Sequence, residues 1–360
     1  MITRVNDFLA KPRLMNRRVK MNIDTHSHFW PKNFLEAMHN GKDFFGWKPI
    51  QNGGKLGISL GDIELNFPVP KVDLDDLDAR FKKRNEFQPI SMEAIQIVGF
   101  LWCQHLDADD AIKYATLVNN ELADAQTKKP DKFRGMGMVP IQSVELATRE
   151  IKRLKNELGI TSLAMPTSFR GENSDEGNLL KIIEIAAKED MSMSFHATYL
   201  NPVGNDRYPR YYFMNSFGAP AETSLSLMSL IYSGFFDRFP EARVQFMQGG
   251  GCVPYSVMRF SQRYAEREDC RVMNHPPHEY LNKIYFDCLT HDDLSLRLLI
   301  DRAGIDKIMI GTDYPFKSDH PGGASNWIRN GVLHESEVEK VAFQNAARFL
   351  RLPKELLNNT

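Results

Sequence analysis

Short apolar runs alternate with longer amphipathic stretches along most of the chain, from residue 21 onward. The longer stretches repeat their apolar positions every three or four residues, which is the pattern of strands and helices alternating around a parallel sheet. Helices are predicted at, among others, residues 111–128, 144–158, 179–188, 221–236 and 335–350. Eight strands are predicted, at residues 21–28, 92–100, 133–141, 160–167, 191–197, 243–248, 283–289 and 307–313. This order predicts an α/β fold of the (β/α)8 TIM barrel type.

The interval between the first two strands, residues 31–90, breaks this rhythm. A turn at Gly53 and Gly54 precedes apolar residues that alternate with other types, namely Leu56, Ile58, Leu60, Ile63, Leu65 and Phe67. A period of two is typical of strands with one buried face. We therefore expect a small β-hairpin subdomain inserted over the barrel mouth after the first strand. The alternative is a surface loop with no part in the site.

Composition excludes several classes of protein. The chain has 360 residues with 45 Lys and Arg against 46 Asp and Glu, and this balance argues against a nucleic-acid partner. No apolar run reaches the roughly 18 residues that cross a bilayer, so no membrane partner is expected. Four cysteines lack the paired spacing of a metal ribbon or disulfide scaffold, which favours a cytoplasmic protein.

The first 20 residues carry six basic side chains and one acidic side chain. They contain no apolar stretch of the length found in signal peptides. We therefore expect residues 1–20 to be a basic N-terminal extension and residues 21–360 to form the barrel domain with its insertion.

Histidine and aspartate residues stand at the ends of three predicted strands. His26 and His28 are two residues apart in the first strand, so both side chains share one face. His196 ends the fifth strand and Asp313 ends the eighth. Active sites of barrels lie at these carboxyl ends, and such ligands suit Zn²⁺ or Mn²⁺ with one position left open. We expect a metal site there, with a metal-free buried polar network as the alternative.

Longer segments carry a resemblance to a known family. They are IDTHSHFWP from Ile23, LVNNELADA from Leu117, FGAPAETSLSLMSLIYSGFFDRFPEARV from Phe217, GGGCVPYSVMRF from Gly249, YFDCLTHDDLSLRLL from Tyr285 and IMIGTDYPF from Ile308. The chain resembles the 2-amino-3-carboxymuconate-6-semialdehyde decarboxylase branch of the amidohydrolase superfamily. The resemblance implies a (β/α)8 barrel with a small insertion, ligands at His26, His28, His196 and Asp313, loss of CO₂ without oxidation and usually a homodimer.

Binuclear barrel hydrolases usually bridge two metals through a modified lysine at the end of the fourth strand. The corresponding segment here reads Leu163-Ala164-Met165-Pro166-Thr167 and contains no lysine. We therefore expect one ion per chain.

The chain departs from the family pattern at Gln248, where the family has a histidine before the triple glycine. An amide donates or accepts hydrogen bonds but cannot take a proton from water, so Gln248 is expected to bind or orient the substrate. His291, after the seventh strand, matches the family and is a candidate acid-base residue. The alternative for His291 is a capped histidine at a helix start.

A second departure concerns the substrate carboxylate, which the family prototype binds with an arginine from the insertion. This chain has no arginine between Arg18 and Arg80. We expect Arg207 and Arg210, after the fifth strand, to supply that charge, although solvated loop arginines are the alternative. Trp102 is a candidate contact for a planar substrate, with packing as its alternative role.

The leading interpretation is a metal-dependent, non-oxidative decarboxylase of an unsaturated or aromatic carboxylic acid. In this interpretation the substrate binds the ion directly, and Asp313 exchanges a proton with the carbon that loses CO₂. The alternative is a hydrolase or hydro-lyase that attacks a small cyclic or conjugated substrate with metal-bound hydroxide. A third possibility is a metal-binding or scaffold protein without activity, against which the intact ligand set argues.

Overall fold

The computed structural model describes residues 21–65, 69–70, 73, 76–87, 89–198, 202–208, 210–316, 332–353 and 355. The expected N-terminal extension at residues 1–20, and Phe67 of the expected hairpin, lie outside these described residues.

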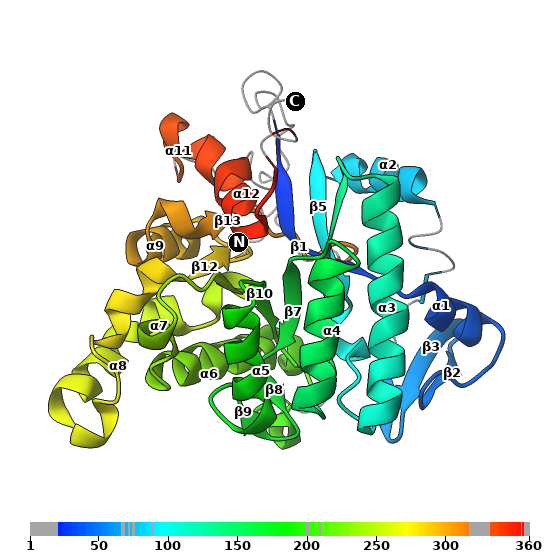
Figure 1. Cartoon of the computed structure of the whole chain (residues 1–360), viewed down its shortest axis with the longest axis horizontal. Helices are drawn as coiled ribbons and strands as arrows, with labels where there is room; N and C mark the ends of the chain where they lie inside the picture. Colours follow the sequence, from blue (N-terminus) through cyan, green and yellow to red (C-terminus); the bar gives the residue numbers. More distant parts are fainter. Residues whose placement is uncertain are drawn as a thin grey trace, which may run out of the picture.

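Eight parallel strands form the barrel (Figure 1), and their order in the sheet is their order in the chain. Backbone bridges from Asp24 to Ile310 and from Ser27 to Tyr314 join the last strand region to the first, so the sheet closes on itself. The strands are β1 (Ile23–Phe29), β5 (Met92–Ile97), β6 (Phe133–Gly137), β7 (Ser162–Pro166), β10 (Ser192–His196), β11 (Val244–Phe246), β12 (Tyr285–Asp287) and β13 (Ile308–Met309). The predicted (β/α)8 barrel is confirmed.

Several observed strands are shorter than predicted at their carboxyl ends. The sixth was expected to reach residue 248 and stops at Phe246, and the eighth was expected to reach residue 313 and stops at Met309. Gln248 and Asp313 instead have left-handed backbone conformations, with φ of 57° and 61°, which no strand can contain.

Helices connect the strands and cover the outside of the barrel. Most of these helices have a side-chain cap or a glycine at one end. At the start of α3, Asp107 accepts a hydrogen bond from the backbone N–H of Asp110, and at the start of α4, Ser143 accepts one from the backbone N–H of Leu146. The predicted helix at 221–236 is divided at Gly234, whose φ is 70°. The connecting helices are α3 (Ala108–Lys128), α4 (Val144–Asn156), α5 (Gly177–Lys188), α6 (Ala219–Tyr232), α7 (Phe235–Arg238), α8 (Val253–Glu266), α9 (Asp293–Ala303), α11 (Glu335–Glu339) and α12 (Asn345–Leu350).

The insertion after β1 is larger than a hairpin. The predicted hairpin is present as β3 (Lys55–Leu60) and β4 (Ile63–Leu65), and β2 (Trp47–Asn52) adds a third antiparallel strand. The alternation did not predict β2, because Lys48, Gln51 and Asn52 interrupt its apolar pattern. Along the chain, α1 (Lys32–His39) precedes this sheet and α2 (Leu77–Phe87) follows it. The helix α1 lies next to the sheet, whereas α2 lies at the opposite end of the molecule (Figure 1). The sheet lies at the same end of the molecule as the short pair β8 (Ser168–Phe169) and β9 (Glu172–Asn173), as both views show.

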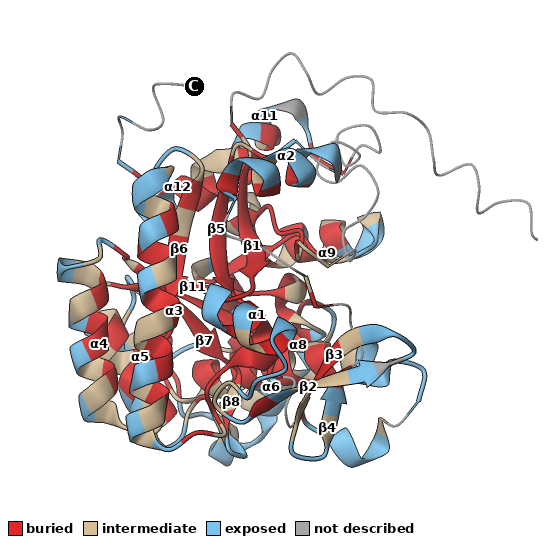
Figure 2. Cartoon of the chain, turned by 90° about the vertical axis from the view of Figure 1, so that its right-hand side faces the viewer, coloured by how far each residue is buried: buried red, intermediate tan, exposed pale blue. Residues whose placement is uncertain are grey.

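Burial follows this layered arrangement (Figure 2), with buried strands inside and helices that expose only their outer faces. All seven residues of β1 are buried, including the polar ones Asp24, Thr25, His26, Ser27 and His28. None of the described helices is long and apolar enough to span a membrane.

Two buried arginines of α2 neutralise carboxylates on the barrel strands. Arg84 donates to Asp24 at 2.9 Å and lies 3.4 Å from a carboxylate oxygen of Glu93. Arg80 forms an ion pair with Asp73, contacts Glu93 at 3.2 Å and donates to the backbone carbonyl of His28 at 2.9 Å. Because buried charges are tolerated only when paired, this cluster fixes α2 against β1 and β5.

We predict that replacing Arg84 with Ala lowers the free energy of unfolding by about 3–5 kcal/mol, because Asp24 and Glu93 lose a buried partner. Urea denaturation measures the loss. A matched control is Arg297→Ala, which breaks the exposed pair with Asp301 and should cost less than about 1 kcal/mol. Equal losses in the two variants would show that the buried cluster does not stabilise the fold.

Candidate metal centre and active site

Three histidines and one aspartate converge at the carboxyl ends of β1, β10 and the region after β13. Their candidate ligand atoms all lie within 4.8 Å of one another. The Oδ1 atom of Asp313 is 3.0 Å from Nε2 of His28 and 3.4 Å from Nε2 of His26. The ring of His196 is edge-on to the other two, with centroids 5.2 Å from His26 and 4.8 Å from His28. The structure thus brings the four expected ligands together.

Each histidine directs its Nδ1–H to an oxygen that can only accept. His26 donates to the Asp287 carboxylate at 2.5 Å, His28 to the carbonyl of Ile97 at 3.2 Å and His196 to the carbonyl of Ala197 at 3.0 Å. A carbonyl or carboxylate acceptor fixes the tautomer, so Nε2 is the basic nitrogen in each neutral ring. Such outer hydrogen bonds are typical of histidines that bind a metal through the other nitrogen.

Burial and close contacts shift the pKa values of the clustered side chains. Burial alone would lower the pKa of His26, but its contacts with Asp287 and Asp313 raise that pKa to about 10. Burial and the two neighbouring histidines hold the pKa of His196 well below its usual range. Burial would raise the pKa of Asp313, yet His26 and His28 hold it well below its usual range. A carboxylate beside three imidazoles therefore stays ionised.

The donor set fits a divalent metal ion. Nε2 of His26 is buried and makes no hydrogen bond among the described residues, an arrangement that is costly unless another partner occupies the space. Three imidazole nitrogens and a carboxylate oxygen are ligands of Zn²⁺ and related ions. These observations favour a metal centre over the alternative of a metal-free polar network.

Asp287, at the end of β12, joins the histidine cluster to the loop after β11. Besides His26, its carboxylate accepts the backbone N–H of Gln248 at 3.0 Å and that of Gly249 at 2.7 Å. Asp287 was not among the residues predicted from the sequence. An aspartate at the end of an otherwise apolar strand was the available signal, because a buried carboxylate needs a partner.

Two glycines of the family motifs are required by close contacts. A Cβ on Gly251, whose φ is 64°, would lie 2.2 Å from the carbonyl oxygen of Pro220. A Cβ on Gly311 would lie 2.6 Å from Cβ of Asp287 and 2.8 Å from Cβ of His26. Only glycine leaves room for the backbone to approach the site this closely.

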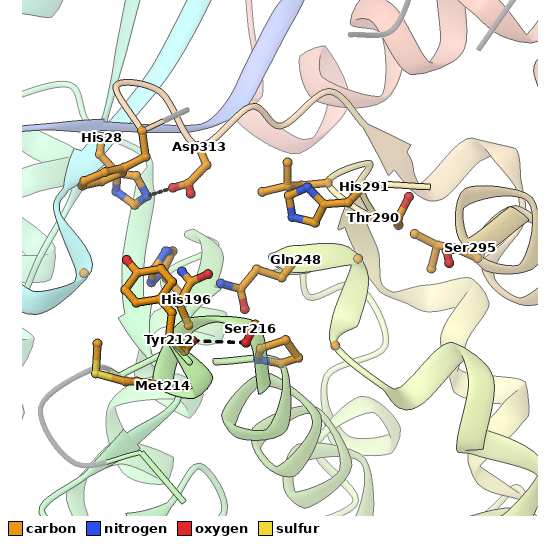
Figure 3. Close-up of a pocket in the computed structure, with 18 of the residues that line it drawn as sticks. His28, His196, Tyr212, Met214, Ser216, Gln248, Thr290, His291, Ser295 and Asp313 are labelled. Carbon is orange, nitrogen blue, oxygen red and sulfur yellow. Dashed lines mark hydrogen bonds and ion pairs between the residues drawn. The ribbon is translucent and has the colours of Figure 1, made fainter. Parts of the chain in front are cut away.

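The cluster opens into a cavity of about 900 Å³ (Figure 3). His28, His196 and Asp313 line one part of it. Gln248 and His291 line it as well, and Figure 3 shows both side chains facing the space beside Asp313. The side-chain oxygen of Gln248 accepts a hydrogen bond from the hydroxyl of Thr223 at 3.2 Å, which orients the amide.

Four of the nine described non-glycine residues with a positive φ line this cavity. Gln248, His291 and Asp313 have φ values of 57°, 59° and 61°, and Tyr212 has 56°. Non-glycine residues adopt this left-handed conformation at a cost, and it occurs preferentially at functional sites. Tyr212 was not found from the sequence, because an aromatic residue in a loop gives no distinguishing signal. It lines the cavity, and burial together with the charge of Asp313 raises its pKa.

The structure does not bring the three expected substrate-binding residues to the cavity. Arg207 and Arg210 are exposed on the loop after β10, where Arg210 stacks on the ring of Tyr211 at 5.4 Å. Trp102 is buried and lines a separate small space beside Gln104. The insertion does reach the cavity, since Leu65 of β4 lines it.

The comparisons with known proteins agree with this geometry. The sequence profile of the amidohydrolase family matches residues 23–352. The 2-amino-3-carboxymuconate-6-semialdehyde decarboxylase of Dictyostelium discoideum is 30% identical over 343 residues, which cover 92% of each chain. The gamma-resorcylate decarboxylase of Polaromonas sp. is 28% identical over 267 residues, which cover 68% of this chain and 78% of that one.

A solved structure of a dihydroxybenzoic acid decarboxylase from Polaromonas sp., with bound manganese and the inhibitor 2-nitroresorcinol, has a TM-score of 0.71. The two sequences are 20% identical, and the superposition covers 94% of this chain and 99% of the Polaromonas chain, which supports the barrel fold. The family profile spans the barrel from β1 to the end of α12. The chain therefore belongs to the amidohydrolase family, in the branch that includes 2-amino-3-carboxymuconate-6-semialdehyde decarboxylase.

Proposed function

We propose that the chain is a metal-dependent, non-oxidative decarboxylase of an aromatic or unsaturated carboxylic acid. The observation that carries the proposal is the cluster of His26, His28, His196 and Asp313, which opens into a cavity large enough for a small acid. The relatives reported above are named as decarboxylases, which supports the same reaction. The substrate is a small-molecule carboxylic acid.

The proposed cofactor is one Zn²⁺ or Mn²⁺ ion per chain, held by His26, His28, His196 and Asp313. The manganese in the related dihydroxybenzoic acid decarboxylase supports this ligand chemistry. When bound, such an ion acts as a Lewis acid that withdraws electron density from a coordinated oxygen.

The side chains around the cavity have separate proposed roles. Asp313 is the only carboxylate among the described residues that line the cavity, so it is the group placed to exchange a proton with the carbon that loses CO₂. Gln248, held by Thr223, offers its amide N–H to a substrate oxygen. His291 is exposed to the cavity and is a second candidate for proton exchange.

Gln248 favours decarboxylation over hydrolysis. A hydrolase or hydro-lyase needs a base that removes a proton from the attacking water; an amide cannot serve, so that task would fall to Asp313 or His291. Decarboxylation does not need that step. The same position can therefore hold a neutral hydrogen-bonding group without loss of the proposed reaction.

The expected homodimer and cytoplasmic location remain parts of the proposal. Large apolar side chains that are well exposed, among them Tyr211 and Phe217, support a self-association surface. All four cysteines are free, which is consistent with a reducing compartment.

The direct test of the function is a scan for CO₂ release by the metal-loaded protein with hydroxylated benzoic acids and unsaturated acids. We expect CO₂ together with a product that carries a new hydrogen on the carbon that lost it. In D₂O that carbon should acquire deuterium. Incorporation of oxygen from ¹⁸O-labelled water into the product, without CO₂, would instead establish hydrolysis or hydration.

For the metal centre, we predict about one divalent ion per chain and none after joint replacement of His26 and His28 by Ala, because the remaining ligands are too few. Elemental analysis of protein purified without chelator measures the content. His291→Ala is the matched control and should retain the ion, because His291 lies outside the cluster. Two ions per chain, or retention by the double variant, would contradict the assignment.

For Gln248, we predict that Gln248→Ala weakens substrate binding or turnover by about 1–3 kcal/mol, the scale of one lost hydrogen bond in a buried site. Loss of a required acid-base group would reduce turnover by a factor of about 10² to 10⁴. We expect Gln248→His to keep the metal without raising turnover. Steady-state kinetics of both variants measures these effects. A large gain in turnover in Gln248→His would contradict the prediction and indicate water activation at this position.

A further inference from the structure

The cavity is larger than a single-ring acid requires. Its volume of about 900 Å³ lies near the top of the range of about 300–1,000 Å³ that is usual for sites of drug-sized ligands. Only one part of this space borders the metal ligands. The remainder is a continuous extension whose lining indicates what kind of group it accepts.

The two ends of the cavity have different linings. At the metal end, the ring of Phe316 is 5.9 Å from that of His28, and the ring of Phe100 is 6.4 Å from that of Phe316. The other end is formed by the start of α8 and the inner side of α9, and we call it the α8–α9 arm. Figure 3 shows Ser295 of α9 on the far side of His291 and Gln248 from His28. The apolar residues of the arm are Pro254, Tyr255, Leu289, Leu298 and Leu299.

No lysine or arginine is among the described residues that line the cavity. A ligand with a second carboxylate in the α8–α9 arm would therefore lose part of its hydration without a lysine or arginine to replace it, which is unfavourable. An apolar group in the same place is stabilised, because its surface is removed from water. The lining thus selects against a second charge and in favour of an apolar group.

We propose that the acid decarboxylated by this enzyme carries an extended, uncharged apolar substituent, and that this substituent lies in the α8–α9 arm. The inference rests on the proposed function for the position of the carboxylate at the metal end. Leu298 is the residue that determines this specificity, because it lies on α9, lines the arm and is partly exposed to it.

Binding of 3-alkylphenols to the full chain tests the arm without requiring turnover. Calorimetry of a series from methyl to heptyl should show a dissociation constant that falls about fourfold for each added methylene until the arm is filled. A dissociation constant that does not depend on chain length would overturn the inference.

Two substitutions on α9 locate the alkyl chain. Leu298→Arg places a charge in the arm and should abolish the gain in affinity with chain length. Leu294→Arg is the matched control, because Leu294 is 79% exposed on the same helix and does not line the cavity. An equal gain in affinity per methylene in both variants would show that the alkyl chain lies outside the arm and would refute the proposal. If Leu298→Arg fails to fold, Leu298→Trp should limit the gain to the shortest chains, and an unlimited gain would again refute it.

The outcomes separate this inference from the proposed function. If the alkylphenols bind with the expected dependence on chain length and no acid releases CO₂, the arm is supported and the proposed reaction is wrong. If acids release CO₂ while affinity is independent of chain length, the reaction stands and the proposed substituent is wrong.

Discussion

Three imidazole rings and a carboxylate can share a small buried space only if each polar atom has a defined partner. Here the Nδ1 atoms of the three histidines all donate to acceptors outside the cluster, at Asp287, Ile97 and Ala197. With Nδ1 engaged in this way, Nε2 is the nitrogen that each ring offers to the cluster, whose candidate ligand atoms lie within 4.8 Å of one another. Asp287 and Ile97 are the last residues of β12 and β5, and Ala197 follows β10 directly, so the ends of three strands hold these acceptors in place.

The same constraint couples parts of the chain that are far apart in sequence. Asp287 accepts from His26 and from two backbone N–H groups of the loop that carries Gln248, so the candidate ligand His26 and this loop share one carboxylate. From the insertion, Arg80 binds the backbone carbonyl of His28. The guanidinium groups of Arg80 and Arg84 also lie about 5 Å from the ring centroid of Tyr314, next to Asp313. These two arginines of the insertion thus stabilise β1, and neither of them lines the cavity.

The sequence by itself determined the barrel and the four candidate metal ligands. Periodicity of two and of about 3.6 is a local property, so eight strands and their helices could be read from it. His26 and His28 share a face by the geometry of one strand, and parallel strands bring His196 and Asp313 to the same end of the barrel. The identity of Gln248 was also visible, and with it the absence of a base at that position.

Only the tertiary structure decided which other side chains reach the site. Arg207, Arg210 and Trp102 are of suitable type, yet the path of their loops leaves the arginines exposed and the tryptophan in another space. Asp287 and the α8–α9 arm became evident because their partners are distant along the chain. The physical reason is that periodicity specifies the faces of regular elements, whereas the course of a loop and the shape of a cavity depend on contacts between many segments at once.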